Sequence, residues 1–324
     1  MSTNKSTITR AADRVDAIAQ EPFHQSGTQP GTSRASGFVS SLLDIFRHRE
    51  LLKLLVNREL KARYKDSSLG FVWTLIRPLV MLMIYYVAIG QFLGAARGIP
   101  VFAIFVFCGL TLWNLFSEIV ATGTTSILAN AGLIKKVYLP REIFPVATIG
   151  AALFNFAVQF LVLIIGAAAL GALEISWQLL FIFPALAVTL VYGLALALAL
   201  SALNVYLRDI QFLVEVGLLI FFWLSPITYA WSFVVETVPP WLEQIYLLNP
   251  MTNAILAFQR AIWGPGSRET MVEQTDGTVR AVAGQPWPAD MALHLFLVFL
   301  VGLVLVWVSH RIFRRLEGNF AQEI

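Results

Sequence analysis

The sequence predicts an all-α membrane protein with six transmembrane helices, and three observations support this fold class. Of its 324 residues, 57% are hydrophobic and only 13% are charged, whereas soluble domains carry about 25% charged residues. The apolar residues gather in runs of about 20 residues or more, the length that crosses a hydrocarbon core. The basic residues concentrate beside the ends of these runs. The six runs lie near residues 69–94, 101–123, 144–172, 177–203, 210–231 and 290–312.

Two segments precede the first run. Residues 1–38 are rich in Ser, Thr and Gly and lack the apolar stretch of a signal peptide, so we expect a disordered cytoplasmic tail. Residues 39–66 combine helix-forming residues, an incomplete apolar face and many Lys and Arg. This pattern predicts an amphipathic helix that lies at the membrane surface. A basic anchor before the first span is the alternative.

The basic residues also predict the orientation of the chain. Lys and Arg are frequent before the first run and after the second and sixth, and they are sparse in the first and third loops. Because cytoplasmic loops carry the excess of Lys and Arg, we expect both termini and residues 127–144 in the cytoplasm. This bias accounts for the net charge of +3 without nucleic-acid binding. The single cysteine, Cys108, excludes an intramolecular disulfide.

Three runs contain residues that are unfavourable in lipid. The first contains Arg77 and then Pro78, which removes a helical hydrogen bond. The second contains Glu118 and the fifth contains Glu215. Ionisable residues inside spans usually mark functional positions, so each is a candidate. Glu215 lies close enough to the cytoplasmic start of its run that hydration there is an alternative explanation.

The fifth loop, residues 232–289, contains two further apolar segments. These are WLEQIYLL at 241–248 and MTNAILAFQRAIW at 251–263, separated by Asn249 and Pro250. Each is too short to cross the membrane. Since backbone in lipid must satisfy its own hydrogen bonds, we expect a re-entrant pair of helices at 241–263 that enters from the outer face. The remainder, 264–289, is predicted to be loop.

Residues 127–144 form a cytoplasmic loop of unusual composition. Its apolar residues are Leu133, Ile134, Val137, Tyr138 and Leu139, its charged residues are Lys135, Lys136, Arg141 and Glu142, and Pro140 ends the apolar part. A loop that only reversed the chain would not need an apolar face. The pattern therefore predicts a short amphipathic element that docks on a partner. A helix that contacts only lipid is the alternative.

Five stretches of the chain occur in the order that is typical of one known family. They are LGFVWTLIRPLVMLMIYYVAIG (69–90), LIKKVYLPREIFPVA (133–147), NVYLRDIQFLVEVGLLIFFWLSPITY (204–229), LNPMTNAILAFQRAIWG (248–264) and RRLEGNFAQEI (314–324). Over residues 50–324 the chain resembles the membrane subunit of type-2 ABC exporters of lipid-linked polysaccharides, which include O-antigen, teichoic-acid, capsule and galactan exporters. The long N-terminal tail departs from the short start usual in this family.

The resemblance implies a type-2 ABC transporter fold, with residues 67–324 as the transmembrane domain. It implies a homodimer in the bacterial inner or plasma membrane, with two copies of a separate ATPase that binds ATP and Mg, and a polysaccharide on a polyprenyl pyrophosphate carrier as cargo. The sequence contains no G-x-x-x-x-G-K-[ST] motif, the loop that holds nucleotide phosphates. We therefore expect no cofactor and no catalysis in this chain.

The resemblance also assigns roles to residues. A coupling helix at about 129–142 would contact the ATPase through Leu133, Lys135, Lys136, Tyr138, Leu139, Pro140, Arg141 and Glu142. The aromatic residues Phe71, Trp73, Tyr85, Tyr86, Phe221, Phe222, Trp223, Tyr229 and Trp231 would line the channel. The cations Arg63, Lys65 and Arg77 would hold the pyrophosphate at its entrance. Asn249, Pro250, Phe258 and Arg260 would form the outer gate. Interfacial anchoring and packing are the ordinary roles of such aromatic residues.

Other classes of membrane protein fit less well. A membrane glycosyltransferase needs acidic residues in a loop at the membrane face, and the first outer loop near 95–100 contains none. The four histidines have no metal-ligand spacing. A secondary transporter usually carries several ionisable residues within its spans. A type-2 ABC exporter of a small lipid or drug shares the predicted architecture and remains the alternative.

Overall fold

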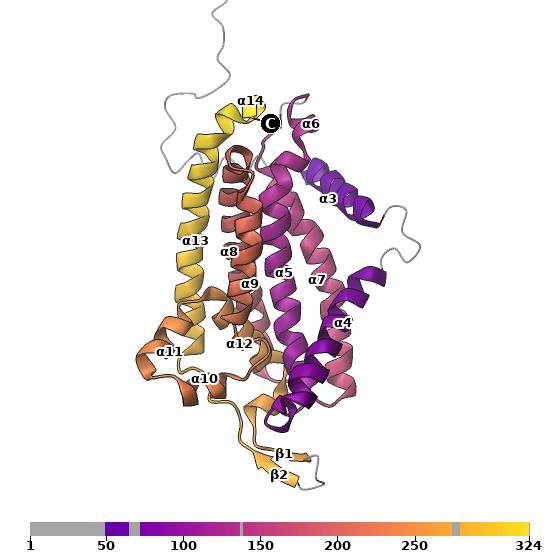
Figure 1. Cartoon of the computed structure of the whole chain (residues 1–324), viewed down its shortest axis with the longest axis vertical. Helices are drawn as coiled ribbons and strands as arrows, with labels where there is room; N and C mark the ends of the chain where they lie inside the picture. Colours follow the sequence, from indigo (N-terminus) through magenta and orange to yellow (C-terminus); the bar gives the residue numbers. More distant parts are fainter. Residues whose placement is uncertain (1–48, 65–71, 137–138, 274–278, 324) are drawn as a thin grey trace, which may run out of the picture. The chain divides into compact units, whose positions relative to one another are not determined.

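The described part of the chain is a bundle of long helices with short helices at both ends (Figure 1). The structure is a computed structural model and describes residues 49–64, 72–136, 139–273 and 279–323. The predicted tail at 1–38 and the candidate residues Lys65, Phe71 and Tyr138 lie outside these ranges. Within them the regular secondary structure is helical except for one two-stranded hairpin.

Five of the predicted spans are confirmed as helices that are long and apolar enough to cross a membrane. The first is α4 (Trp73–Tyr85), which continues as a π-helical segment over Tyr86–Phe92. The others are α5 (Phe102–Ala129), α7 (Ile143–Ala169), α8 (Ile182–Tyr206), preceded by a short 3-10 helix over Trp177–Phe181, and α13 (Met291–Leu316).

The predicted fifth span is shorter than expected. Helix α9 covers Ile210–Trp223, only 14 residues, and at 1.5 Å per residue it is about 21 Å long, less than the hydrocarbon core of about 30 Å. Residues 224–230 form turns rather than helix. Pro226 accounts for this break, because a proline cannot donate the next helical hydrogen bond. A sixth crossing of the membrane stays a prediction.

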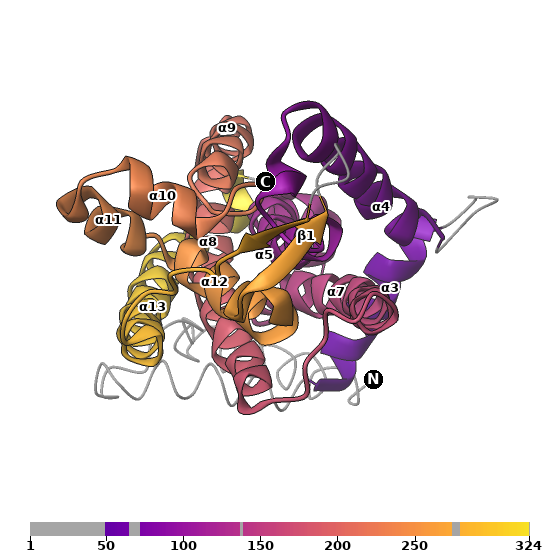
Figure 2. The same cartoon turned by 90° about the horizontal axis from the view of Figure 1, so that it is seen from below.

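Helix α5 occupies the centre of the bundle. It packs against α7 and α8, and α8 packs in turn against α13; Figure 2 shows α5 among the other helices when the bundle is seen from below. The α5–α8 crossing is close because Gly123 faces Ala197: a Cβ added to Gly123 would lie 2.5 Å from the Ala197 Cβ. Residues 104–113 of α5 are buried without exception.

The lower end of the bundle in Figure 1 holds three short helices and the hairpin. The helices are α10 (Trp231–Thr237), α11 (Pro240–Leu247) and α12 (Pro250–Ile262). The two helices predicted at 241–263 are therefore present. Strands β1 (Thr270–Glu273) and β2 (Val279–Val282) pair antiparallel, with Thr270 opposite Val282. This hairpin lies in a stretch predicted to be loop, where Thr and Val supply the β-branched residues that favour strands.

The upper end in Figure 1 gathers the short helices that lie near the chain's basic loops. Helix α3 (Arg49–Tyr64) packs against α7, and α6 (Ala131–Ile134) follows α5. After α13, a 3-10 turn over Glu317–Asn319 leads into α14 (Phe320–Glu323). A separate apolar cluster fills this end, and its buried members include Leu55, Ile134, Phe144, Val205, Phe313 and Phe320. Segments that are far apart in the sequence therefore share one small core.

Candidate functional site

The described part of the loop at residues 130–142 contains a shorter helix than the sequence predicts. Hydrogen bonds and ion pairs hold this loop against the rest of the chain. A coupling helix was expected over about 129–142; among the described residues between 130 and 142, only the single turn α6 is helical. Asn130 fixes its start, since the Asn130 Nδ2 donates to the Ser126 carbonyl at 2.7 Å and the Asn130 carbonyl accepts from the Leu133 and Ile134 amides at 3.0 and 3.1 Å. Pro140 accepts from the Ile143 amide at 3.2 Å. Pro140 therefore begins the turn into α7.

The side chains of this loop divide into two groups. Ile134 is buried in the apolar cluster and Leu133 packs against it, whereas Lys135 and Lys136 are exposed. Leu139 and Pro140 are partly buried. Leu133 and Ile134 of the predicted apolar face thus contact the chain's own core, whereas Val137 and Tyr138 lie outside the described residues, and the two lysines present their charges at the surface.

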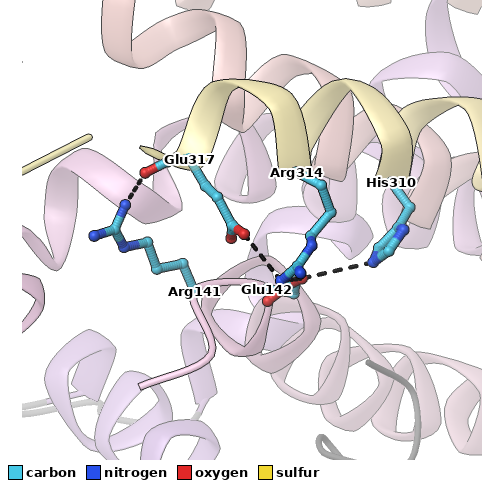
Figure 3. Close-up of polar contacts among 5 residues, drawn as sticks. All are labelled: Arg141, Glu142, His310, Arg314 and Glu317. Atoms are coloured by element: carbon cyan, nitrogen blue, oxygen red, sulfur yellow. Dashed lines mark hydrogen bonds and ion pairs between the residues drawn. The ribbon is translucent and has the colours of Figure 1, made fainter. Parts of the chain in front are cut away.

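Arg141 and Glu142 bind the end of α13 (Figure 3). The Glu142 side chain is only 3% exposed, and its Oε1 lies 3.6 Å from the His310 Nε2 and 3.7 Å from the Arg314 Nη1. The Arg314 Nη1 also lies 2.9 Å from the Glu317 Oε1. Arg141 donates to the Glu317 carbonyl. We call these five residues the loop–α13 cluster.

The electrostatics of the cluster favour a charged Glu142. Burial raises the pKa of this carboxyl group, but the neighbouring His310 ring, the backbone and the Arg314 guanidinium together lower the pKa below its ordinary value. A buried carboxylate is stable only when such partners compensate the loss of water. In this structure the Glu142 carboxylate therefore contacts His310 and Arg314 of its own chain. Its predicted contact with an ATPase stays a prediction.

The C-terminal residues cover the same loop. Phe320 is fully buried against Phe313, at 5.5 Å between ring centroids, and against Tyr206, at 6.2 Å. The Arg141 guanidinium lies over the Phe320 ring, 5.6 Å from its centroid. The Tyr206 hydroxyl donates to the Leu316 carbonyl at 2.6 Å. The loop, the end of α8 and the chain's last residues therefore form one unit.

Helix α3 reaches the loop from another side. Arg58 donates to the Asn130 Oδ1. Val56 lies against Gly150 of α7, where an added Cβ would come within 2.6 Å of the Val56 Cγ2. Only glycine allows this approach of the two helices. The predicted helix is thus present over Arg49–Tyr64, and its position in a membrane surface stays a prediction.

Sequence reasoning missed several residues of this site. His310, Arg314, Glu317, Phe320, Asn130 and Arg58 were assigned no role. A signal was available for three of them, because His310, Arg314 and Glu317 are spaced four and three residues apart and so share one face of the end of α13 and the turn that follows it. The pairing of that face with Glu142 depends on the tertiary structure.

The aromatic residues predicted to line a channel are divided between surface and core. The exposed ones are Trp73, Tyr86, Phe221 and Trp223. Tyr85 stacks on the buried Phe222, with centroids 5.9 Å apart. Trp231 is buried, and the Tyr229 hydroxyl donates to the Trp223 carbonyl at 3.0 Å. Phe222 and Trp231 therefore pack inside the protein in this structure.

Of the three cations predicted to lie at the channel entrance, the structure describes the side chain of only one. Arg77 is exposed on α4 next to the buried Pro78. Arg63 belongs to α3, but its side chain lies outside the described part of the structure, as does Lys65. Of the three cations, the structure therefore places only Arg77, and a shared site stays a prediction.

The predicted outer-gate residues belong to a buried helix. The Asn249 Oδ1 accepts from the Met251 amide at 2.9 Å and so caps α12, which starts at Pro250. Phe258 is fully buried against Phe160, 5.9 Å between centroids. Arg260 lies over the Phe181 ring at 5.3 Å. Helix α12 thus forms part of the core.

The turn before α10 is held by the side chains of α12. The Gln259 Nε2 donates to the Pro226 carbonyl at 3.0 Å, and the Asn249 Nδ2 donates to the Ser225 Oγ at 3.2 Å. These bonds satisfy backbone and side-chain groups that the interrupted helix leaves without partners. Among the described residues, no group of three or more His, Cys, Asp or Glu is arranged to hold a metal ion.

The fold and this site define a helical membrane protein whose basic loop contacts α3, the end of α13 and the turn that follows it. Residues 50–263 match the ABC-2 type transporter family, so the chain belongs to that family. It is similar to the O-antigen export system permease protein RfbA of Myxococcus xanthus, with 28% identity over 281 residues, 87% of this chain and 98% of the relative.

Two other relatives carry related names. An O-antigen export system permease protein RfbA of Klebsiella pneumoniae is 26% identical over 275 residues, 84% of this chain and 94% of the relative. The capsule polysaccharide export inner-membrane protein CtrC of Neisseria meningitidis serogroup B is 23% identical over 227 residues, 67% of this chain and 80% of the relative. These matches extend over most of the length of each protein.

Proposed function

We propose that this chain is the membrane subunit of an ATP-driven exporter that moves a lipid-linked polysaccharide from the cytoplasmic to the outer face of the bacterial inner or plasma membrane. The observation that carries the proposal is the nearly full-length similarity to permeases named for O-antigen export. An exporter of a small lipid or drug is the alternative that shares the family.

The partner of the chain is a separate ATPase that binds ATP and Mg. Two copies of the chain form the conduit and two ATPase subunits bind beneath it. Both termini lie in the cytoplasm, and α9 with the residues that follow it completes a sixth crossing. The basic loops at the end of the bundle that holds α3, α6 and α14 support this orientation, because an excess of Lys and Arg marks the cytoplasmic side.

The contact with the ATPase involves the exposed part of the 130–142 loop. Lys135 and Lys136 are exposed, while Ile134 below them is buried. Arg141 and Glu142 fasten the same loop to α13. A force applied at the lysines would therefore reach α5, α7 and α13 together. In this arrangement the lysines recognise the partner, and the loop–α13 cluster transmits its movement.

The test replaces the two lysines and leaves Arg141 unchanged, because Arg141 holds the C-terminal residues. We expect the double variant Lys135→Glu and Lys136→Glu to insert in the membrane and unfold at the wild-type temperature, since exposed charges contribute less than about 1 kcal/mol to stability. It should lose co-purification with the ATPase. Lipid-linked glycan should then accumulate on the cytoplasmic face, as measured by extraction of the membrane lipids and labelling of the glycan that is still linked to its carrier.

The control is Lys53→Glu, which reverses one exposed charge on α3 outside the loop. It should leave export at the wild-type level. Wild-type export by the loop variant would contradict the coupling role. Accumulation of a small lipid in place of a glycan, in cells depleted of the chain, would favour the alternative substrate class.

A further inference from the structure

The partly exposed surface of α5 is polar, unlike the surfaces of its neighbours. Between residues 111 and 127, six residues of α5 are partly exposed and all the others are buried. The six are Asn114, Ser117, Glu118, Ala121, Thr122 and Thr125. Their spacing of three and four residues places them on one face of the helix. We call this face the α5 polar stripe.

The neighbouring long helices show the opposite pattern. In α7 from Val146 to Ala169, and in α8 from Ile182 to Leu203, every exposed or partly exposed residue is apolar or glycine. Their polar residues, such as Asn155, Gln159 and Thr189, are buried. This is the arrangement expected for surfaces that contact lipid. The stripe does not fit such a surface, because amide and carboxyl groups are costly in hydrocarbon.

Hydrogen bonds to α7 hold the two largest polar residues of the stripe in place. The Asn114 Nδ2 donates to the Gln159 Oε1 at 3.0 Å, and the Glu118 Oε1 accepts from the Asn155 Nδ2 at 2.7 Å. The two pairs lie one helical turn apart and form a ladder between antiparallel helices. If polar residues were only tolerated at Asn114 and Glu118, the buried partners Gln159 and Asn155 on α7 would not be needed.

The hydroxyl groups of the stripe present acceptors. The Ser117 Oγ donates to the Asn114 carbonyl at 3.3 Å, the Thr122 Oγ1 to the Glu118 carbonyl at 2.6 Å and the Thr125 Oγ1 to the Thr122 carbonyl at 3.2 Å. Each hydroxyl proton is used within the helix, and the oxygen lone pairs remain available. Helix α5 contains no Lys or Arg. The stripe therefore offers oxygen acceptors and no cation for a phosphate.

The stripe begins beyond the place where the π-helical segment after α4 meets α5. This segment reaches the start of α5, where an added Cβ on Gly90 would meet the Phe102 ring at 2.9 Å. Asn114 is about three helical turns further along α5. Figure 2 shows α4 and α9 on the same side of α5. These two helices carry Trp73, Phe221 and Trp223, which the family resemblance predicts to line the conduit.

We propose that the α5 polar stripe lines the inner half of the conduit, is exposed to water, and accepts hydrogen bonds from the hydroxyl groups of the sugar cargo. This inference rests on the proposed function and deepens it. The charged carrier head requires cations, which the stripe lacks, so the stripe contacts the glycan part of the cargo. A dry contact with a second copy of the chain is the competing outcome.

Water access is tested by single-cysteine labelling of the complex with its ATPase. The native cysteine, Cys108, is fully buried and is replaced by alanine. Ser117→Cys is compared with Val304→Cys on α13, because each position lies twelve residues before the last residue of its helix. Val304 is among the exposed apolar residues of α13. We expect a sulfonated, lipid-insoluble maleimide to label Ser117→Cys at least about tenfold faster, since thiolates form in water and not in lipid.

Equal or slower labelling of Ser117→Cys would overturn the proposal, whether lipid or a second copy covers the stripe. The role in export is tested by the triple variant Ser117→Ala, Thr122→Val and Thr125→Val, which nearly preserves side-chain size. We expect glycan export to fall by about fivefold or more as the acceptors are lost, with an unchanged amount of protein in the membrane. Thr189→Val, the same change at a buried position on α8, should export at the wild-type rate.

The outcomes separate the two proposals. Wild-type export by the triple variant would overturn the stripe's role in export and leave the proposed function intact. Failure of the unchanged chain and its ATPase to export any glycan would contradict the proposed function. In that case the labelling comparison still decides whether the stripe faces water.

Discussion

At the scale of single residues, Glu142 is the most consequential side chain at the loop end of the bundle. It immediately precedes α7, is almost fully buried, and faces His310 and Arg314 of α13. Removing one partner of a buried ion pair leaves the other charge uncompensated. Glu142 therefore links the start of one membrane helix to the end of another.

We expect Glu142→Gln to lower the free energy of unfolding by about 1–3 kcal/mol, measured by thermal unfolding of the purified chain in detergent. The pKa of Glu142 is lowered in the folded protein, so its contribution is present above the pKa of the unfolded chain and is lost as the pH falls through the folded pKa. The difference in the free energy of unfolding between the Glu142→Gln variant and the wild type should therefore become smaller as the pH falls below the ordinary carboxyl range of about pH 4.

The matched control for this prediction is Glu50→Gln. Glu50 lies on α3 with 72% of its side chain exposed, 3.0 Å from the Lys53 Nζ. Exposed pairs contribute little, and we expect the two unfolding temperatures to agree at every pH. A Glu142→Gln variant as stable as wild type at neutral pH would show that the loop–α13 cluster contributes nothing to stability.

At the scale of elements, the bundle depends on the close crossing of α5 and α8. Gly123 permits this crossing because an added Cβ would lie 2.5 Å from the Ala197 Cβ and 3.1 Å from its Cα. Backbone and Cβ atoms cannot move aside as a long side chain can. The two helices would have to separate, and the polar contacts around their inner ends would separate with them.

We expect Gly123→Ala to destabilise the chain by about 1–3 kcal/mol through overpacking. Gly217→Ala is the control. Gly217 is also within an apolar helix, but nothing lies within 4 Å of an added Cβ, so alanine should be neutral or stabilise by up to about 1 kcal/mol. The measurement is the unfolding temperature of both variants in the same detergent. Equal effects of the two changes would show that the α5–α8 crossing is not tightly packed.

At the scale of the whole molecule, much of the exposed apolar surface lies on α4, α7, α8, α9 and α13. Met83 on α4 is 67% exposed, and Leu213 on α9 is 66% exposed. In a single copy all these surfaces are chemically alike. In the proposed two-copy conduit we expect α4 and α9, rather than α7, to face the second copy, because they carry the exposed Trp73, Phe221 and Trp223 that the resemblance predicts to line it.

We expect oxidation to cross-link two copies that carry Leu213→Cys, in the background without Cys108, because facing α9 helices bring the thiols together. The control is Leu161→Cys on α7, where the side chain is 60% exposed and should face lipid. The measurement is the dimer band on a non-reducing gel of native membranes. A dimer band at position 161 and none at 213 would contradict the proposed arrangement.

Much of the architecture could be predicted from the sequence because lipid imposes a simple rule on length and polarity. Five apolar runs appear as helices close to their expected ends, for example α13 at Met291–Leu316. The helices on either side of Asn249 and Pro250 were likewise predictable. The short α9 was not, because the apolar run continues beyond Pro226 and composition alone does not show where the helix stops.

The sequence by itself determined which segments of this protein are helical membrane segments and which loops are basic, since both follow from residue chemistry along a single stretch of chain. Only the tertiary structure decided that Glu142 faces His310 and Arg314, that Phe258 and Trp231 pack in the core, and that the partly exposed face of α5 is polar. Those facts depend on how helices far apart in the sequence rotate and cross. Helix rotation is set by close packing at residues such as Gly123 and Gly150, which composition and periodicity do not reveal.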